Sequence, residues 1–404
     1  MDSKKKRVCR KIKKIIEKVS KKYDREWIKR KRKIDSKFLI DFIFQLVIKG
    51  GKGYGVIISE MCDKYGDKKI NKSQENRYAQ STICEARKKL SPTAFREIND
   101  EIIKAQDFDT KYKLMGKHRV YAIDGTKVRL RKELEKEGYK KFNRDAYFPS
   151  GLLSCMYDVN THIVHDFAIT KSFSERDRAL KHIETLEKND ILIMDRGYFS
   201  YLLLRKIVDQ KAHGLFRIQG NLRNKEIIRF VNSSRKDMVI KYSPSETVKR
   251  DLRKIGHDIN FSEIKLRLLK RKIKGKLYVF TTTLTKSEYK AKMFDDLYHK
   301  RWDIEELYKI SKEHFGIEEM HAKTDIIIRR EIYAHIVLIN IARLLEHSDD
   351  EVEDNKKVNF KACLTAIENC SLLLMLKRMI LSDFYTQFGL HTYCSKSFLC
   401  DLKK

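Results

Sequence analysis

Hydrophobic residues recur with a helical period through the first quarter of the chain. In residues 1–36 the apolar positions return every three or four residues among many lysines and arginines, and this pattern predicts a basic amphipathic helix. Residues 38–47 are almost continuously apolar and are soon followed by two glycines, so we expect a buried helix there. Residues 80–90 predict a further helix with a basic face, which should end before Pro92.

The pattern changes near residue 117, where short segments rich in β-branched and aromatic residues begin. Two of these segments form a predicted hairpin, and Ser174 is the expected N-cap of the helix that follows. The predicted order is strand, strand, strand, helix, strand, helix, strand, in residues 118–125, 151–158, 161–169, 174–187, 191–195, 201–209 and 213–219. This order fits an α/β fold with an RNase H-like mixed sheet.

The same patterns divide the chain into regions. Basic strand-like stretches, such as residues 237–242 and 276–283, interrupt the mixed α/β pattern, and mostly helical sequence follows them. The predicted regions are a basic helical DNA-binding region (1–105), a first part of the RNase H-like core (106–221), a β-rich insertion (222–285), a second part of the core (286–345) and a helical C-terminal region (346–404).

The chain carries a large excess of positive charge. Its 88 lysines and arginines outnumber its 56 aspartates and glutamates, which gives a formal net charge of +32 over 404 residues. Such an excess attracts polyanions, so nucleic acid is the first candidate partner and an anionic membrane surface the second. A charge that serves solubility, or a genome biased toward lysine, would give the same composition. The N-terminal helix could likewise lie along phosphates, lie on lipid or present a solvated face.

The cysteines and the N-terminal sequence predict an intracellular protein. None of the eight cysteines lies in a C-x-x-C pair, which argues against a zinc ribbon and against a disulfide framework. The lysine-rich N-terminus lacks the apolar stretch of a secretion signal, and no run of about 18 apolar residues suggests a membrane span. The expected location is the cytoplasm or nucleoid of a prokaryotic host, or the nucleus of a eukaryotic one.

Two aspartates close predicted strands. Asp124 follows the apolar residues of the first strand, and Asp195 follows those of a later one. Sites in open sheets gather at strand ends, where neighbouring loops converge. Clustered carboxylates repel each other unless a cation neutralises them, and Mg²⁺ prefers such oxygen ligands. A single aspartate at a strand end is commonly a cap or turn residue, so either position alone does not define a site.

A third acid belongs to a more specific pattern in residues 298–312. Tyr298, Arg301, Glu305 and Lys312 have the spacing Y-x2-R-x3-E-x6-K. On one helix these offsets would fall along a single stripe that carries an aromatic ring, a carboxylate and two cations. The cations could bind phosphates, and the ring could stack on a displaced base. An ordinary charged amphipathic helix explains any two of these residues better than it explains all four.

These motifs resemble the insertion-sequence-four family of DDE transposases. The residues 298–312 match the family's YREK signature, and Arg301–Glu305 resembles its R-W-x-I-E core. Met194–Tyr198 is similar to the block around the family's second aspartate, and Ile123–Thr126 to the block around the first. The long interval between Asp195 and Glu305 also fits, because the family carries a β-rich insertion there. The resemblance covers about residues 80–345.

The resemblance implies site residues and a cofactor. Asp124, Asp195 and Glu305 would be the catalytic acids and would hold two Mg²⁺ ions, for which Mn²⁺ could substitute. The residues that would contact phosphates and a flipped base near the transposon end include Tyr298, Arg301, Trp302 and Lys312. Arg217, at the end of a predicted strand, is a further candidate for DNA binding.

The family resemblance also implies an activity and partners. It implies cut-and-paste transposition by a homodimer on paired transposon ends, with double-stranded DNA as substrate and target and with no membrane partner. Two other readings remain open at this stage. One is a domesticated or inactive relative that binds DNA without cutting it, and the other is a stand-alone endonuclease on the same fold. A membrane-surface protein rests on charge alone.

Overall fold

The fold is described from a computed structural model of the chain. The described residues are 4–27, 34–65, 80–105, 112–218, 224–257, 260–273, 275–313, 315–347, 356–357, 367 and 393–394. The helices expected from Phe360 onward lie almost entirely outside them. The internal contacts of the chain form two compact units. Unit 1 consists of Met1–Asp107, Val128–Gly151 and Ile310–Lys404, and unit 2 of Phe108–Lys127 and Leu152–Lys309.

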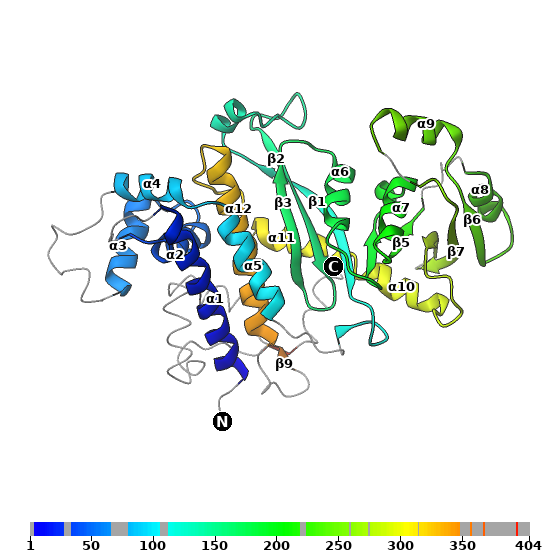
Figure 1. The fold of residues 1–404 in the computed structure, drawn as a ribbon, viewed down its shortest axis with the longest axis horizontal. Coiled ribbons are helices and arrows are strands. Elements are labelled where there is room, and N and C mark those ends of the chain that lie inside the picture. The colour runs from blue at the N-terminus through cyan, green and yellow to red at the C-terminus, as the bar shows by residue number, and fades with distance from the viewer. Residues whose placement is uncertain are drawn as a thin grey trace. The chain divides into compact units, whose positions relative to one another are not determined.

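An eight-stranded mixed sheet forms the centre of unit 2, and its first three strands are seen side by side in Figure 1. The strands lie in the order β3 (Ile163–Thr170), β2 (Ser150–Asp158), β1 (Val120–Arg129), β4 (Ile191–Met194), β5 (His213–Arg217), β8 (Lys276–Thr282), β7 (Ile264–Ile273) and β6 (Asp237–Tyr242). Strands β1, β4 and β5 are mutually parallel. The pairs β2–β3, β5–β8, β8–β7 and β7–β6 are antiparallel.

The segment predicted as a β-rich insertion extends this sheet. Its strand β8 pairs with β5 over Leu215–Arg217, so backbone hydrogen bonds join the segment to the core strands. The segment also contains two helices that the hydrophobic pattern did not predict, α8 (Lys225–Asn232) and α9 (Glu246–Lys254). Each begins at a polar N-cap, Asn224 or Ser245, whose side chain accepts backbone N–H groups of the first turn.

Two helices pack on one face of the strands that carry the predicted acids. Tyr121 and Ile123 of β1 belong to the same hydrophobic cluster as Leu192 and Met194 of β4. The helices α6 (Glu175–Ile183) and α7 (Tyr201–Asp209) contribute apolar residues to this cluster. The intervening residues of both strands are equally buried, so the strands are covered on both faces, as is usual for parallel strands. Ser174 is the N-cap of α6, which confirms the prediction.

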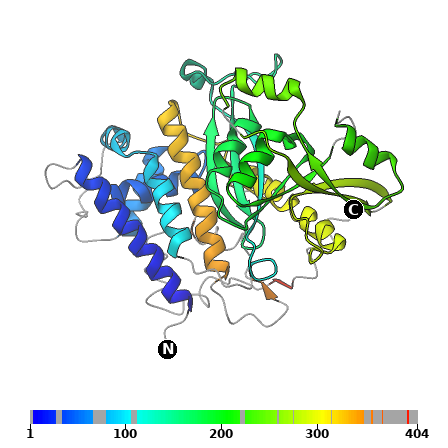
Figure 2. The same cartoon turned by 45° about the vertical axis from the view of Figure 1, so that its right-hand side comes forward.

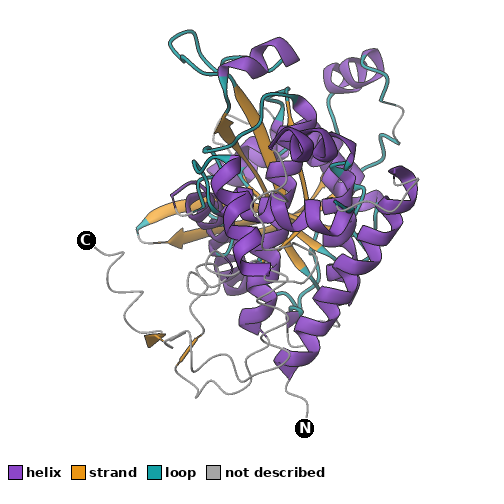
Figure 3. Cartoon of the chain, turned by 90° about the vertical axis from the view of Figure 1, so that its left-hand side faces the viewer, coloured by secondary structure: helices purple, strands orange, loops and turns teal. Residues whose placement is uncertain are grey.

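Unit 1 is mainly helical. The first helix is basic and amphipathic as predicted, because its apolar side chains are buried while its exposed lysines form ion pairs with partly buried acids. Figures 2 and 3 show its long helices. They include α1 (Lys4–Trp27), α2 (Ser36–Ile48), α3 (Tyr54–Tyr65), α4 (Gln80–Lys89), α5 (Thr93–Ala105) and α12 (Asp325–His347), and the short helix η3 (Lys132–Glu137) precedes β2. The predicted helices at 38–47 and 80–90 are confirmed by α2 and α4.

Cys9, Cys84 and Cys155 are free, and Cys9 and Cys155 are buried. In the part of the chain that the structure describes, every helix is too short or too polar to cross a membrane.

Candidate active site

The two aspartates of the predicted triad occupy neighbouring positions on parallel strands. Residues Val120–Ala122 of β1 pair with Ile191–Ile193 of β4. Continued by two residues, this register sets Asp124 beside Asp195, whose backbone is still extended, with φ −70° and ψ 168°. Neighbouring strands are about 4.8 Å apart, so the two side chains leave the sheet from adjacent Cα atoms. The register therefore brings these two acids together.

Asp124 lies within its strand, and the prediction that it closes the strand is wrong. Strand β1 continues through Gly125 to Arg129, well past the end of β4. This later part of β1 lies beside β2, which is its other neighbour in the sheet. The local pattern at Gly125 suggests a strand end, but a partner strand distant in the sequence supplies the hydrogen bonds that keep the backbone extended. Because β4 ends at Met194, Asp124 lies at the point where β1 loses this neighbouring strand.

Hydrogen bonds from two side chains hold the backbone at Asp124. The Tyr308 hydroxyl donates to the Asp124 carbonyl at 2.7 Å, and the Ser154 hydroxyl lies 3.4 Å from the same oxygen. Ser154 is in turn 3.0 Å from Nε2 of His182, and Nδ1 of His182 is 2.7 Å from the Asp166 carboxylate. All of these side chains are buried. A buried polar network thus fixes the backbone of the first predicted acid.

The Asp124 carboxylate stands in a half-buried and acidic environment. Burial raises the pKa of its carboxyl to about 6, and the neighbouring charges of Glu175 and Glu305 add to this effect. The Gly125 N–H, 2.9 Å away, and the Arg301 guanidinium act in the opposite direction. Carboxylates crowded in this way favour a proton or a cation.

Asp195 accepts a hydrogen bond from the tyrosine of the predicted signature. The Tyr298 hydroxyl donates to Oδ1 of Asp195 at 2.9 Å. Its ring packs on Phe280 of β8, with a centroid distance of 4.9 Å, and is only 6% exposed. Burial raises the pKa of Tyr298, so the hydroxyl stays protonated and remains a donor. In this structure Tyr298 orients a carboxylate, and its ring is too buried to stack on a base without moving.

The signature residues do not share one helix, so the predicted single stripe is wrong. Helix α10 (Ala291–His299) contains Tyr298, and α11 (Trp302–Glu313) contains Glu305 and Lys312. Between them the N–H groups of Arg301 and Ile304 donate to carbonyls three residues earlier, at 3.2 and 3.4 Å. These tighter bonds replace the four-residue bonds of an α-helix. The break between the helices contains no proline or glycine. We attribute it to the buried side chains on either side, because Tyr298 is held at Asp195 and Arg301 is held at Asp124 and Glu305.

Arg301 links two of the predicted acids. Its Nη2 atom donates to Glu305 Oε1 at 2.6 Å, and its Nη1 atom lies 3.7 Å from Asp124 Oδ2. The arginine side chain is 8% exposed, whereas those of Asp124 and Glu305 are 21% and 38% exposed. Although burial lowers it, the pKa of Arg301 remains above its usual value because of the hydrogen bond to Glu305 and the nearby charges. The guanidinium therefore acts as a fixed counter-ion between the two carboxylates.

Two further predicted residues lie close to these acids. The Trp302 side chain follows Arg301, lies 5.5 Å from its guanidinium and is 55% exposed. Arg217 ends β5, and the pairing of Met194 with Phe216, continued by one residue, sets it beside Asp195. Its guanidinium lies 4.7 Å from the centre of the Tyr278 ring. An exposed ring and a cation therefore flank the acidic centre in unit 2.

Lys312 is the one signature residue that belongs to unit 1. It lies in the last turn of α11, and its ammonium is 4.0 Å from the Glu318 carboxylate. The structure therefore brings together Asp124, Asp195, Tyr298, Arg301 and Glu305 in unit 2, while Lys312 is described only within unit 1.

Sequence reasoning missed several residues that contact the acids. Tyr308 and Ser154 bind the Asp124 backbone, and Glu175 and Tyr198 lie near its carboxylate. Tyr308 could have been noticed, because it follows Glu305 by three positions and so faces nearly the same direction on a helix. Ser154 carries no local signal, because it lies in an otherwise apolar strand.

The acids fit a divalent metal in chemistry, although they are not gathered into a finished metal site. All three offer carboxylate oxygens, the ligands that Mg²⁺ and Mn²⁺ prefer. A bound cation would offset the burial and the neighbouring negative charges that raise the pKa of Asp124. Within the described ranges, no three acidic, histidine or cysteine side chains converge closely enough to hold a metal ion. Arg301 provides the positive charge between two of them in this structure.

Comparison with solved structures agrees with this fold. The cryo-EM structure of the piggyBac transposase synaptic complex with hairpin DNA matches the chain with a TM-score of 0.50 and 13% sequence identity. The match covers 100% of this chain and 84% of that one. The predicted fold class, α/β with an RNase H-like mixed sheet, is confirmed by this likeness and by the strand order.

Sequence comparison identifies the family. The chain is 22% identical over 275 residues to the transposase InsG for insertion sequence element IS4 of Escherichia coli (strain K12). This alignment covers 66% of the chain and 60% of that relative, so the chain spans less than two thirds of its length. The sequence profile of the family described as "Transposase DDE domain" matches residues 115–341, which is more than half of the chain. The chain therefore belongs to the DDE transposases, and it is similar to the IS4 transposase among them.

Proposed function

We propose that the chain is a DNA transposase, which cuts DNA at transposon ends in a metal-dependent reaction and joins those ends to target DNA. One observation carries the proposal: Asp124 and Asp195 lie in register on neighbouring strands, and Arg301 links Asp124 to Glu305. Family membership supports the same reading. The proposed reaction is cut-and-paste transposition.

Each acid has a proposed role in holding metal. Asp124, Asp195 and Glu305 would bind two Mg²⁺ ions, which Mn²⁺ could replace. When bound, such a pair of ions activates the attacking oxygen and stabilises the leaving oxygen of a phosphodiester. The Tyr298 hydroxyl would keep the Asp195 carboxylate turned toward the site through its 2.9 Å hydrogen bond. The Tyr308 hydroxyl would hold the backbone of Asp124 in place.

Arg301 has two proposed states. In the structure it neutralises Asp124 and Glu305, which would otherwise repel each other. When cations occupy the acids, this neutralisation is no longer needed, and the guanidinium can bind a DNA phosphate in bidentate fashion. Its low exposure limits it to phosphates that enter the site itself. Arg301 would then position the strand that is cut.

The remaining predicted residues would contact DNA around this centre. Trp302 is the most exposed aromatic residue of the signature segment, so we assign base stacking to Trp302 rather than to the buried Tyr298. Arg217, beside Asp195, would bind a phosphate. Lys312 would also bind a phosphate, and its ammonium would have to leave Glu318 to do so.

The proposed reaction proceeds in four transfers. A water molecule attacks a phosphodiester at the end of the element and releases the element's 3′-OH on the strand that is cut. That 3′-OH attacks the opposite strand and closes a hairpin, and the structural neighbour is itself described as a complex with hairpin DNA. Water reopens the hairpin, and the 3′-OH then attacks target DNA. We propose that a homodimer carries out these steps on two paired ends.

Cleavage of a labelled duplex that carries the element's own ends tests the proposal. The wild type is compared with Asp195→Ala, with Mg²⁺ and with a chelator. The matched control is Glu184→Gln, which removes an exposed acid that pairs only with a lysine at the surface. We expect metal-dependent cutting by the wild type and the control, and none by Asp195→Ala.

The products of the same assay separate the alternatives. Strand-transfer products joined to a target duplex support a transposase. Cutting without joining would replace the proposal with a stand-alone endonuclease. End-specific binding without cutting by any variant would replace it with a domesticated or inactive DNA-binding relative.

A further inference from the structure

A fourth acid stands at the start of α6, next to the proposed metal-binding centre. Glu175 is the first residue of α6 and follows the N-cap Ser174, whose hydroxyl accepts the Asp177 N–H at 3.3 Å. Glu175 is half-buried and forms no salt bridge with any residue that the structure describes. A glutamate in the first turn of a helix commonly does no more than stabilise the helix dipole. The surroundings of Glu175 therefore decide whether it has a further role.

The N-terminus of α6 is tied to the loop that carries Asp195. The Arg176 guanidinium donates to the Gly197 carbonyl at 2.8 Å, and Gly197 lies two residues after Asp195. This bond joins the residue that follows Glu175 to the end of β4. The first turn of α6 is therefore tied to the segment that follows Asp195 at the end of β4.

The Glu175 side chain also approaches the backbone of β1 beside Asp124. A Cβ atom added to Gly125 would lie 3.2 Å from Cγ and 3.4 Å from Oε1 of Glu175. It would also lie 2.9 Å from Cδ1 of Leu152. Because Gly125 has no side chain, the carboxylate of Glu175 can reach the backbone immediately after Asp124. The charge of Glu175 also acts on the Asp124 carboxyl, where it adds to the effect of burial in raising the pKa.

A buried hydroxyl completes this corner. Tyr198 is 3% exposed, and its hydroxyl makes no hydrogen bond of normal geometry with the described residues. The charges of Asp124 and Glu175 act on this hydroxyl, and the Glu175 carboxylate is within its reach as an acceptor. Buried hydroxyls almost always have a partner, either in the protein or in an ordered water. A hydroxyl with no such bond beside two carboxylates is therefore suited to bind a water molecule that belongs to the coordination shell of a cation.

We propose that Glu175 is a fourth metal-binding acid, which shares a divalent cation with Asp124. The inference rests on the proposed function, because it concerns the same metal-dependent centre. A pair of carboxylates is sufficient, since Mg²⁺ is usually held by one or two carboxylates together with waters and substrate phosphates. The Tyr198 hydroxyl would accept or donate a hydrogen bond to one of those waters. Metal binding by Glu175 then requires glycine at position 125, because a side chain there would occupy the space that Glu175 uses.

Direct titration of Mn²⁺ onto the whole chain, followed by electron paramagnetic resonance, tests this proposal without DNA. The variants are Glu175→Gln, Asp124→Asn and the matched control Asp177→Asn. Asp177→Asn removes the same charge from the same turn of α6, but Asp177 is exposed whereas Glu175 is half-buried. We expect Glu175→Gln to weaken Mn²⁺ binding about 10–100-fold and Asp177→Asn to leave it within about twofold. The midpoint of thermal unfolding without metal should be the same in both.

Each outcome decides between the two proposals. If Asp124→Asn weakens Mn²⁺ binding and Glu175→Gln does not, the role of Glu175 is wrong while the proposed function stands. If Glu175→Gln and Asp177→Asn lower the unfolding midpoint equally and leave Mn²⁺ binding unchanged, Glu175 only stabilises the helix. If the wild type binds no Mn²⁺, or if Asp124→Asn has no effect, the metal centre itself is wrong, and both proposals fall.

Discussion

Among the residues that the structure describes, two buried arginines pair with glutamate, and they differ in what surrounds them. Arg87 in unit 1 lies 3.0 Å from Glu331, and both side chains are 2% exposed. Arg301 in unit 2 lies 2.6 Å from Glu305, which is 38% exposed, and 3.7 Å from Asp124. Both members of the first pair are buried away from solvent, whereas the acids of the second pair are partly exposed to solvent.

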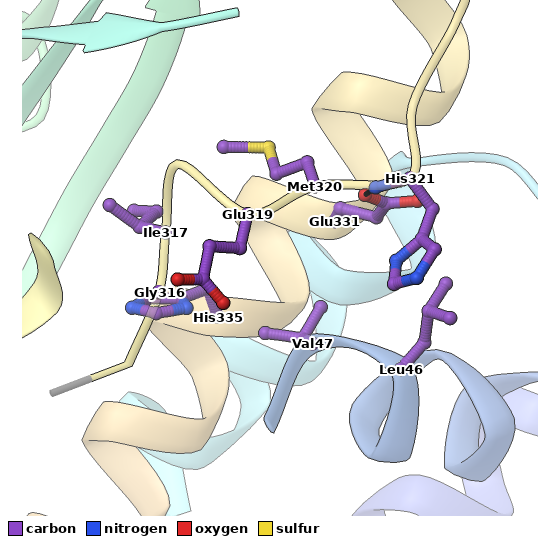
Figure 4. A pocket seen from close by; sticks show the side chains of 9 residues that line it. All are labelled: Leu46, Val47, Gly316, Ile317, Glu319, Met320, His321, Glu331 and His335. Atoms are coloured by element: carbon purple, nitrogen blue, oxygen red, sulfur yellow. Dashed lines mark hydrogen bonds between the residues drawn. The ribbon is translucent and has the colours of Figure 1, made fainter. Parts of the chain in front are cut away.

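The acids of the two centres also differ in their number of partners. Both oxygens of Glu331 are used, since Oε1 pairs with Arg87 and Oε2 accepts the backbone N–H of His321 at 2.9 Å. Arg87 also donates to the Tyr54 hydroxyl. Figure 4 shows Glu331, His321 and His335 around the small pocket at this site. The buried Arg87–Glu331 pair, called the sealed pair below, thus has a single acid, and each of its two oxygens has a hydrogen-bond donor.

Around Arg301 the acids outnumber the positively charged groups. One guanidinium faces Asp124 and Glu305, and Glu175 lies near Asp124 without a cation of its own among the described residues. A buried ion pair is structural where both oxygens of its acid already have donors. Where acids are in excess and partly exposed, the site can take up a further cation.

The largest expected effect is at Glu305. Replacing it in Glu305→Ala should lower the rate of end cleavage by more than about 10³-fold, since loss of a single donor in an active site already costs about 10²–10³-fold. Binding to the duplex should stay within about twofold, because the acid serves the metal. Gel-shift and cleavage assays on the same preparation measure both. The neighbouring exposed acid gives the control, Glu306→Ala; loss of binding along with cleavage in Glu305→Ala would show that Glu305 is structural.

The sealed pair should show the opposite response. Glu331→Gln leaves Arg87 buried without its counter-ion and should lower the free energy of unfolding by about 3–5 kcal/mol. The protein that remains folded should cut DNA at the wild-type rate. Urea unfolding followed by circular dichroism measures the first effect. Glu97→Gln breaks the exposed pair with Lys22 and should cost no more than about 1 kcal/mol. Equal losses in the two variants would remove the contrast.

A smaller effect is expected at Tyr298. Tyr298→Phe removes the hydrogen bond to Asp195 and keeps the ring on Phe280, so cleavage should slow about tenfold. The turnover rate should fall while the Kd for DNA stays constant, because the hydroxyl orients a carboxylate. Tyr147→Phe, at an exposed ring, is the control. A change in Kd alone would instead assign Tyr298 to DNA contact.

The smallest effect concerns pH and the sealed region of unit 1. Burial lowers the pKa of His335 from 6.5 to about 3, so the folded protein keeps this ring neutral. The unfolded chain takes up a proton there once the pH falls below about 6.5. The free energy of unfolding should therefore fall as the pH drops from about 6.5 toward 3. His335→Leu should have a shallower pH dependence between pH 7 and pH 5, and identical slopes would show that His335 does not contribute.

Much of the core could be predicted, because its elements are encoded locally. The strand that ends at Asp195 is a short apolar run, and α7 begins at an N-cap serine and has an apolar stripe. The full length of β1 could not be predicted, since its second half depends on β2. The helices α8 and α9 were missed, because their short basic sequences resemble edge strands until tertiary packing buries one face.

The candidate site was predicted in its residue types and only partly in its arrangement. Spacing placed Asp124, Asp195 and Glu305 among the candidate residues, and whether they act as proposed stays a prediction. The break at Arg301 could not be foreseen, because contacts with Asp124 and Tyr298 impose it rather than a proline or glycine. Glu175 was missed for a similar reason, since only the strand register and the space at Gly125 bring it near the acids.

The short turn between α10 and α11 has a consequence for how the gene can change. Each residue added to an α-helix rotates everything beyond it by about 100°. A single inserted codon between Arg301 and Glu305 would therefore swing the glutamate away from the guanidinium, whichever amino acid it encodes. A codon inserted in the turn between β7 and β8, next to Gly275, would lengthen a loop and leave the four acids where they are. Insertions and deletions should accordingly be tolerated there and eliminated between Tyr298 and Glu305.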